Sequence, residues 1–282
     1  MFTHVQDLQF EAKPDKPDPA FARRFQEVLG GQWGEMTVAT QYLLQGWNCR
    51  LPGKYKDMLL GIGTEELAHV EMIVTMIDRL LDAPINHTES LSAEQAHLNP
   101  QHHIANGGGA SYMDSMGNPW TGAYVTASGN LMADFHYNAT AEMQGRLQVA
   151  RLYNMTDDKG IHNMLRFLLA RDRMHQNQWL AAIEELKADG LEGIPVPEAF
   201  TEDADMDVAY AYIHASDGPE AAAGRWAAGP TPDGKGTFSV QSPPVATGER
   251  PVLPPGDPRL FGTQSPTEGI KSALSKAKDM LT

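Results

Sequence analysis

The sequence predicts an all-α fold: a ferritin-like four-helix bundle with a long crossover between the second and third helices and an extended, turn-rich C-terminal arm. Four long segments repeat apolar residues in alternating steps of three and four, which is the pattern of helices packed in a bundle. The links between these segments are short, long and short in turn, as in ferritin-like proteins. Twelve of the nineteen prolines lie between Pro195 and Pro266, so long helices are excluded there.

Prolines and glycines set the expected limits of the helices. The first helix follows the prolines of 14–19 and ends before Pro52, and the second helix ends before Pro84. Gly190 is a typical C-terminal stop for the fourth helix. The helices are therefore expected over residues 20–51, 54–82, 122–153 and 157–189, with an irregular crossover over 83–121.

This division of the chain predicts two parts. Residues 1–190 are expected to form the bundle with an N-terminal extension, and residues 191–282 the arm. A long proline-rich arm packs more often on its own bundle or on a neighbouring subunit than it floats free, and a disordered tail is the alternative. The last part of the arm, 267–281, returns to a helical pattern.

The composition argues against several classes of protein. The chain of 282 residues has a net charge of −14, with 22 basic against 36 acidic residues, which speaks against a nucleic-acid partner. The single cysteine, Cys49, excludes an internal disulfide framework and cysteine-based metal sites. The sequence shows neither a signal-peptide pattern nor a membrane-spanning stretch, so we expect a cytoplasmic protein.

The inward-facing row of each predicted helix is apolar towards its ends and polar in its middle. Glu35 lies midway along the first helix, Glu66 and His69 along the second, Glu142 along the third and His175 along the fourth. Helices that lie side by side bring these groups to one level, where each unpaired buried carboxylate costs several kcal/mol. Two divalent cations offset this cost, because three carboxylates nearly balance their charge and a bridging hydroxide or oxide absorbs the rest.

The spacing of these residues suits a pair of metal ions. Glu66 and His69 are three residues apart on one face, so Glu66 can bridge two metals while His69 binds one of them. Glu35 and Glu142 can each bind one metal, and His175 supplies the second imidazole. Carboxylates with imidazoles suit manganese and iron.

The inward-facing row also predicts which residues lie next to these donors. In the fourth helix it is expected to pass through Arg171, His175 and Gln178. Glu65 could pair with His69, but it lies one step off the row, so Glu66 is preferred. A Glu-x-x-His pair alone is a weak signal, and the agreement of all four helices carries the metal prediction.

The residues around these donors resemble the manganese catalases. The stretches GGQWGEMTVATQYLLQGWNC and GTEELAHVEMI carry the resemblance, and Glu142 and His175 fit the same pattern. The resemblance covers nearly the whole chain. It implies that the manganese ligands are Glu35, Glu66, His69, Glu142 and His175, with Glu66 bridging.

The resemblance also assigns residues beside the ligands. Tyr42 would donate a hydrogen bond to a ligand carboxylate. Asp172 stands where the family commonly has a glutamate proposed to shuttle protons, so its shorter side chain is a departure from the pattern. Ala141 stands where some relatives have an arginine that screens the cluster, which implies wider access here.

The function that the resemblance implies is disproportionation of hydrogen peroxide to water and dioxygen. It implies two manganese ions per subunit with bridging solvent, and a homohexamer whose C-terminal arms wrap neighbouring subunits. One alternative is a di-iron ferroxidase or oxidase on the same bundle, against which three carboxylates rather than four argue. The other is a coat-like structural relative with a vestigial site, against which the complete set of five donors argues.

Some manganese catalases also bind calcium, and the sequence matches that site only in part. Asp57, Ser216 and Gly218 match it. Gly61 and His214 stand where oxygen donors are expected, and calcium takes six or more oxygens. Calcium is therefore possible but not favoured.

Overall fold

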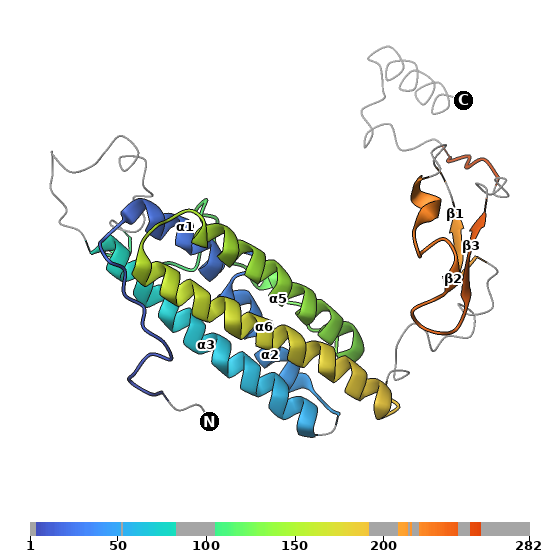
Figure 1. Cartoon of the computed structure of the whole chain (residues 1–282), viewed down its shortest axis with the longest axis horizontal. Helices are drawn as coiled ribbons and strands as arrows, with labels where there is room; N and C mark the ends of the chain where they lie inside the picture. The colour runs from blue at the N-terminus through green and yellow to red at the C-terminus, as the bar shows by residue number, and fades with distance from the viewer. Residues whose placement is uncertain are drawn as a thin grey trace, which may run out of the picture. The chain divides into compact units, whose positions relative to one another are not determined.

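The computed structural model describes residues 4–51, 53–82, 105–191, 208–213, 215, 220–241 and 249–254. Most of the first 191 residues form the helical bundle of Figure 1. The long helices are α3 (Gly53–Leu81), α5 (Leu131–Tyr153) and α6 (Lys159–Ala188), and two shorter helices, α1 (Pro19–Gly30) and α2 (Glu35–Asn48), complete it. Helix α5 packs against α6, and α1 and α2 both pack against α3. The predicted ferritin-like helical fold is confirmed.

The first predicted helix is wrong in one respect, because it is two helices. The break falls between Gly30 and Gly34, and Glu35 opens α2 instead of lying midway along one rod. A side chain at Gly30 would collide with the backbone of Met113 in the crossover. The close approach of a segment distant in sequence therefore accompanies the break.

The predicted third helix begins nine residues later than expected. Residues Gly122–Tyr124 form one short 3-10 turn, η2, and α5 starts at Leu131. The side chain of Asn130 accepts a hydrogen bond from the Ala133 amide, which caps the first turn of α5. Gly129 before it has a φ of +82°, which favours glycine. The helix start is thus set by local capping chemistry.

Two apolar clusters fill the bundle, with a polar layer between them. Along α3, residues up to Ile62 belong to one cluster and residues from Val70 onward to the other. Along α6 the same division falls between Leu168 and Trp179. The predicted pattern of apolar ends and a polar middle is present on both helices. The intervals hold the buried residues Glu66, His69, Asp172 and His175.

The N-terminal segment 4–17 is fixed onto the bundle. Phe10 stacks on Phe167 of α6 with ring centroids 4.6 Å apart, and Arg79 of α3 donates a hydrogen bond of 2.7 Å to the Ala12 carbonyl. The Asp15 amide donates to Asp158, and the Lys159 amide donates back to Asp15. These contacts hold the segment in a defined path across α3 and α6.

The described part of residues 202–282 forms a separate compact unit. It contains β1 (Ala211–Ile213), a 3-10 helix η4 (Glu220–Ala223), β2 (Gly229–Pro230) and β3 (Thr237–Gln241). The strand order is β1-β3-β2, with β1 parallel and β2 antiparallel to β3. The predicted helical pattern at 267–281 lies outside the described residues. Within the described ranges, none of the helices has the length and apolar character needed to cross a bilayer.

Candidate metal centre

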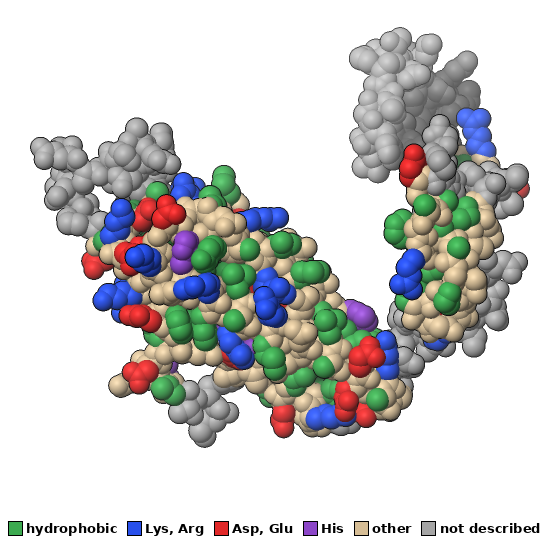
Figure 2. Space-filling model, viewed as in Figure 1, with side chains coloured by type: hydrophobic (Ala, Val, Ile, Leu, Met, Phe, Trp, Pro, Cys, Tyr) green, Lys and Arg blue, Asp and Glu red, His purple; other side chains and the backbone are tan. Residues whose placement is uncertain are grey.

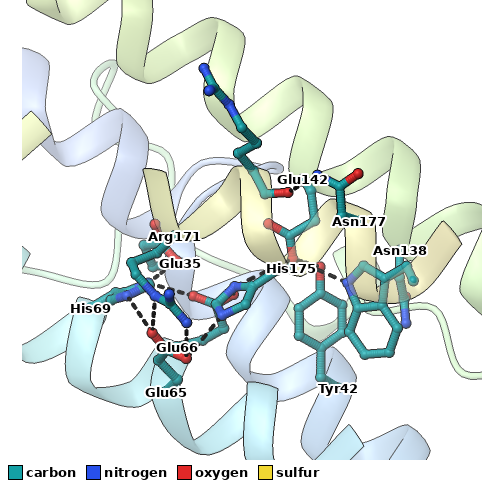
Figure 3. A network of polar contacts seen from close by, with 12 residues as sticks. Glu35, Tyr42, Glu65, Glu66, His69, Asn138, Glu142, Arg171, His175 and Asn177 are labelled. Carbon is teal, nitrogen blue, oxygen red and sulfur yellow. Dashed lines mark hydrogen bonds and ion pairs between the residues drawn. The ribbon is translucent and has the colours of Figure 1, made fainter. Parts of the chain in front are cut away.

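The structure brings the five predicted donors together in the polar layer (Figure 3). They form two groups of three, and within each group the donor atoms lie within 4.8 Å of one another. One group is Glu35, Glu66 and His69, and the other is Glu66, Glu142 and His175. Glu66 belongs to both groups, so its carboxylate lies between them. All five side chains are buried.

The distances are nearly symmetric about Glu66. Nδ1 of His69 lies 2.6 Å from one oxygen of Glu66, and Nδ1 of His175 lies 2.6 Å from the other. On the outer sides, Glu35 lies 3.7 Å from Nδ1 of His69, and Glu142 lies 3.9 Å from Nδ1 of His175. Each half therefore offers one carboxylate, one imidazole and a share of the central carboxylate.

The buried acids do not titrate alike. Burial raises the pKa of Glu35 to about 8, and the charge of Glu66 adds to this. Burial also raises the pKa of Glu142, again with Glu66 adding. Burial alone would raise the pKa of Glu66, but the positive charges of His69 and His175 outweigh it and hold that pKa well below its usual range. Without a cation, burial therefore favours the protonated forms of Glu35 and Glu142, whereas the two histidines favour the ionised form of Glu66.

The imidazoles balance that central charge. Burial would lower the pKa of His175, but the charge of Glu66 outweighs it and raises the pKa to about 10. The pKa of His69 rises well above its usual value for the same reason. In the metal-free protein, the protonated forms of His69 and His175 are therefore favoured, and metal ions would displace these protons.

The unpaired atoms of the site fit a metal pair. Oε1 of Glu66 and Nδ1 of His175 are buried and make no hydrogen bond with any described residue, although they lie 2.6 Å apart. Buried polar atoms of this kind are rare unless water or an ion satisfies them. Oxygen and imidazole nitrogen donors suit manganese and iron, so the residues present fit a dimetal centre.

Tyr42 lies beside Glu142, as the resemblance implied. Its hydroxyl donates a hydrogen bond of 2.6 Å to Oε1 of Glu142. Nε1 of Trp179 donates to the same oxygen over 3.3 Å, and the two aromatic rings pack with centroids 4.8 Å apart. Trp179 is completely buried. The orientation of Glu142 is thus fixed by two donors.

The predicted inward-facing row of the fourth helix is partly wrong. Arg171 and Gln178 are only half-buried, whereas Asp172 and Trp179 are buried. The row therefore steps from Asp172 to His175 and then to Trp179. The sequence contained the signal, since a step of four from His175 reaches an aromatic residue and a step of three reaches a glutamine.

Asp172 is 4% exposed and lies one turn before His175. Burial raises its pKa well above the usual value, and the charges of Glu35 and Glu66 add to this. Gly145 on α5 faces Asp172, since a Cβ built there would lie 4.0 Å from the Asp172 carboxylate, an ordinary van der Waals distance. In the metal-free protein, burial and the neighbouring charges therefore favour the protonated form of Asp172.

Glu65 has a larger role in this network than its place off the row indicated. Its carboxylate accepts hydrogen bonds from Arg171, from Gln9 and from Nε2 of His175. Burial would raise the pKa of Glu65, but these hydrogen bonds outweigh it and hold that pKa well below the usual range. The only sequence signal for this role was its spacing of four residues from His69.

The remaining predictions about the site concern calcium and access. Asp57 is exposed on α3, whereas His214, Ser216 and Gly218 lie outside the described residues, so the predicted calcium site is not tested. Ala141 is buried beside Glu142. No arginine screens the cluster from that position.

Comparison with known proteins agrees with this geometry. The family model for manganese-containing catalase matches residues 1–279. A manganese catalase of Bacillus subtilis is 51% identical over 271 residues, which cover 93% of this chain and 98% of that protein. The manganese catalase of Lactiplantibacillus plantarum is 46% identical over 270 residues, which cover 94% of this chain and 100% of that protein.

A solved structure extends the likeness to the fold. The crystal structure of KatB, a manganese catalase from Anabaena, has a TM-score of 0.69 and 25% sequence identity. The match covers 86% of this chain and 100% of that one. The five donors, the helical bundle and these relatives agree: the chain belongs to the manganese catalase family.

Proposed function

We propose that this chain is a manganese catalase, which converts two molecules of hydrogen peroxide into two of water and one of dioxygen. The observation that carries the proposal is the carboxylate of Glu66, which two buried donor groups share. In this assignment Glu35 and His69 would hold one manganese ion, Glu142 and His175 would hold the other, and both groups would share Glu66. When bound, the manganese pair would supply two-electron redox chemistry, so that one peroxide is reduced to water and the next is oxidised to dioxygen.

The chain's own residues fix the site and keep it small. Tyr42 and Trp179 orient Glu142 through its Oε1, as their hydrogen bonds of 2.6 Å and 3.3 Å support. The two apolar clusters flank the polar layer on both sides along α3 and α6. Apolar surroundings of this kind favour a small uncharged substrate over larger or charged ones.

Metal analysis and oxygen release test this function together. Protein purified from cells supplied with both manganese and iron is expected to contain two manganese ions per subunit and to release dioxygen from hydrogen peroxide. Stoichiometric iron, with little oxygen release after manganese loading, would instead indicate the di-iron alternative. A protein that binds neither metal and shows no activity would indicate the structural alternative.

Asp172 is proposed to accept and return protons during the reaction. Its burial, its raised pKa and its place one turn before His175 support this role. Asp172→Asn is expected to keep two manganese ions per subunit and to lower kcat by about 100-fold, because proton transfer by a placed side chain contributes roughly that much. Stopped-flow oxygen release with parallel metal analysis measures both quantities.

The matched control is Asp134→Asn. Asp134 is also a buried aspartate, but its carboxylate accepts hydrogen bonds from Ser128 and is not among the grouped donors. This variant is expected to keep its kcat. An Asp172→Asn enzyme as fast as the wild type would rule out the proton role.

A homohexamer is the proposed assembly. Apolar side chains on the outer faces of α5 and α6 support association, since Met143, Leu147, Met174 and Leu180 are each 45–47% exposed. Figure 2 shows hydrophobic side chains over this face of the bundle. Removal of residues 196–282 is expected to lower the molar mass of the assembly, because the arm is proposed to wrap neighbouring subunits. Light scattering that shows an unchanged number of subunits would contradict this role of the arm.

Two further expectations stay predictions. One is the cytoplasmic location. The other is calcium, for which two of the three matching residues, Ser216 and Gly218, lie outside the described part of the chain.

A further inference from the structure

We propose that Glu65 positions both histidine ligands at once, and that Arg171 and Gln9 hold Glu65 in place. The inference deepens the proposed function, because it concerns the two imidazoles that would bind the manganese ions. In this role Glu65 binds no metal. It acts through His69 and His175 and is a positioning residue.

The two imidazoles have the same orientation towards Glu65. Nε2 of His175 lies 3.1 Å from one carboxylate oxygen of Glu65, which is a hydrogen bond. Nε2 of His69 is buried, makes no hydrogen bond with any described residue, and lies 3.8 Å from the other oxygen of Glu65, which is an ion-pair distance. The rings lie nearly parallel, 26° apart, with centroids separated by 5.9 Å. One carboxylate thus faces the outer nitrogens of both rings.

The opposite edges of the two rings face the metal centre. Nδ1 of each imidazole lies 2.6 Å from Glu66. Glu65 accepts the Nε2 proton of His175, which fixes the tautomer whose Nδ1 lone pair is free for a metal and makes that nitrogen a stronger ligand. At His69 the same carboxylate acts across the longer ion-pair distance. Glu65 and Glu66, neighbours in sequence, therefore lie at opposite edges of both rings (Figure 3).

Glu65 is itself held by donors from two other segments. Arg171 of α6 forms a two-pronged pair, with Nε 2.6 Å from one oxygen and Nη2 3.1 Å from the other. Nε2 of Gln9 donates a third hydrogen bond of 2.9 Å. Paired bonds from a planar guanidinium restrict the carboxylate in angle as well as in position.

Gln9 connects the N-terminal segment to the centre. The next residue, Phe10, stacks on Phe167, and the ring of Phe167 meets the ring of His69 edge-on at 6.2 Å. The same short segment therefore contacts the surroundings of His69 in two ways. This makes the N-terminal segment part of the support of the histidine ligands.

The test uses manganese release from the full-length loaded protein to an excess of chelator. Loss of a hydrogen-bond partner of a ligand typically lowers metal affinity by about 10–100-fold. We expect both ions to leave Glu65→Gln about 10–100-fold faster than the wild type, and we expect the visible absorption of the oxidised form to shift. Gln9→Ala is expected to accelerate release by a smaller factor.

The matched control is Glu71→Gln. Glu71 also lies on α3 and also pairs with the N-terminal segment, through His4 at 3.3 Å, but its partner is not a ligand. Its release rate and spectrum are expected to equal those of the wild type. If Glu65→Gln does not fold, Arg171→Gln replaces it as the test variant. Its control is then Arg173→Gln, because Arg173 is an exposed arginine of the same helix.

The outcomes separate this inference from the function. A Glu65→Gln or Arg171→Gln protein with the release rate and spectrum of its control would overturn the inference, even while the wild type stays an active catalase. Faster loss of only one ion would overturn the claim that Glu65 serves both histidines. Failure of the function itself would be visible in the wild type, which would then hold no manganese pair.

Discussion

Glu66→Gln is expected to lose both metal ions and to lower oxygen release by more than about 100-fold. The substitution keeps the size of the side chain but removes the one ionised carboxylate that both donor groups share. Loss of a residue that only hydrogen-bonds to a metal ligand lowers metal affinity by about 10–100-fold, so loss of the bridging ligand itself is expected to lower it further. Elemental analysis and an oxygen electrode give the two quantities on one preparation.

The matched control is Glu27→Gln. Glu27 is a partly buried glutamate of α1 that accepts hydrogen bonds from Ser115, outside the centre. It is expected to keep both ions and full activity. A Glu66→Gln protein that keeps two ions would contradict the bridging assignment.

Metal uptake by the metal-free protein is expected to release protons and to strengthen as the pH rises towards 8. Burial raises the pKa of Glu35 to about 8, and the charge of Glu66 raises the pKa of His175 to about 10 against the effect of burial. Both groups therefore carry protons at pH 7 that metal ions must displace. Since a raised pKa means more bound protons in the metal-free state, a higher pH favours uptake.

The expected size of this effect is about tenfold in affinity per pH unit for each proton released below the pKa of its group. Calorimetric titration with manganese in two buffers of different ionisation enthalpy counts the protons directly. Affinity that stays constant from pH 6 to 8, with no proton release, would mean that these groups do not face the metals. Glu35→Gln is expected to reduce the proton count by one.

The helices of the bundle follow from the sequence because burial imposes their periodicity. Their ends follow less well, because some depend on contacts between distant segments. The break after Gly30 coincides with the approach of Met113 from the crossover, and no local pattern announces that approach. The start of α5 is different, since the capping residue Asn130 was available in the sequence.

The sequence likewise predicts only part of the candidate site. The five donors lie on inward-facing rows, so periodicity alone predicts that they meet. The residues that orient them come from other places: Gln9 reaches Glu65 across 56 positions, and Trp179 appears only when the row takes a step of four. Helical periodicity does not predict a role in the site for residues that lie beside the inward-facing row, such as Glu65.

The dimanganese centre is tested most directly by an anomalous-scattering map of the purified protein, measured at the manganese edge. We expect two peaks per subunit, one between Glu35 and His69 and one between Glu142 and His175, with Glu66 contacting both. A single peak, peaks away from these residues, or a signal at the iron edge alone would contradict this expectation.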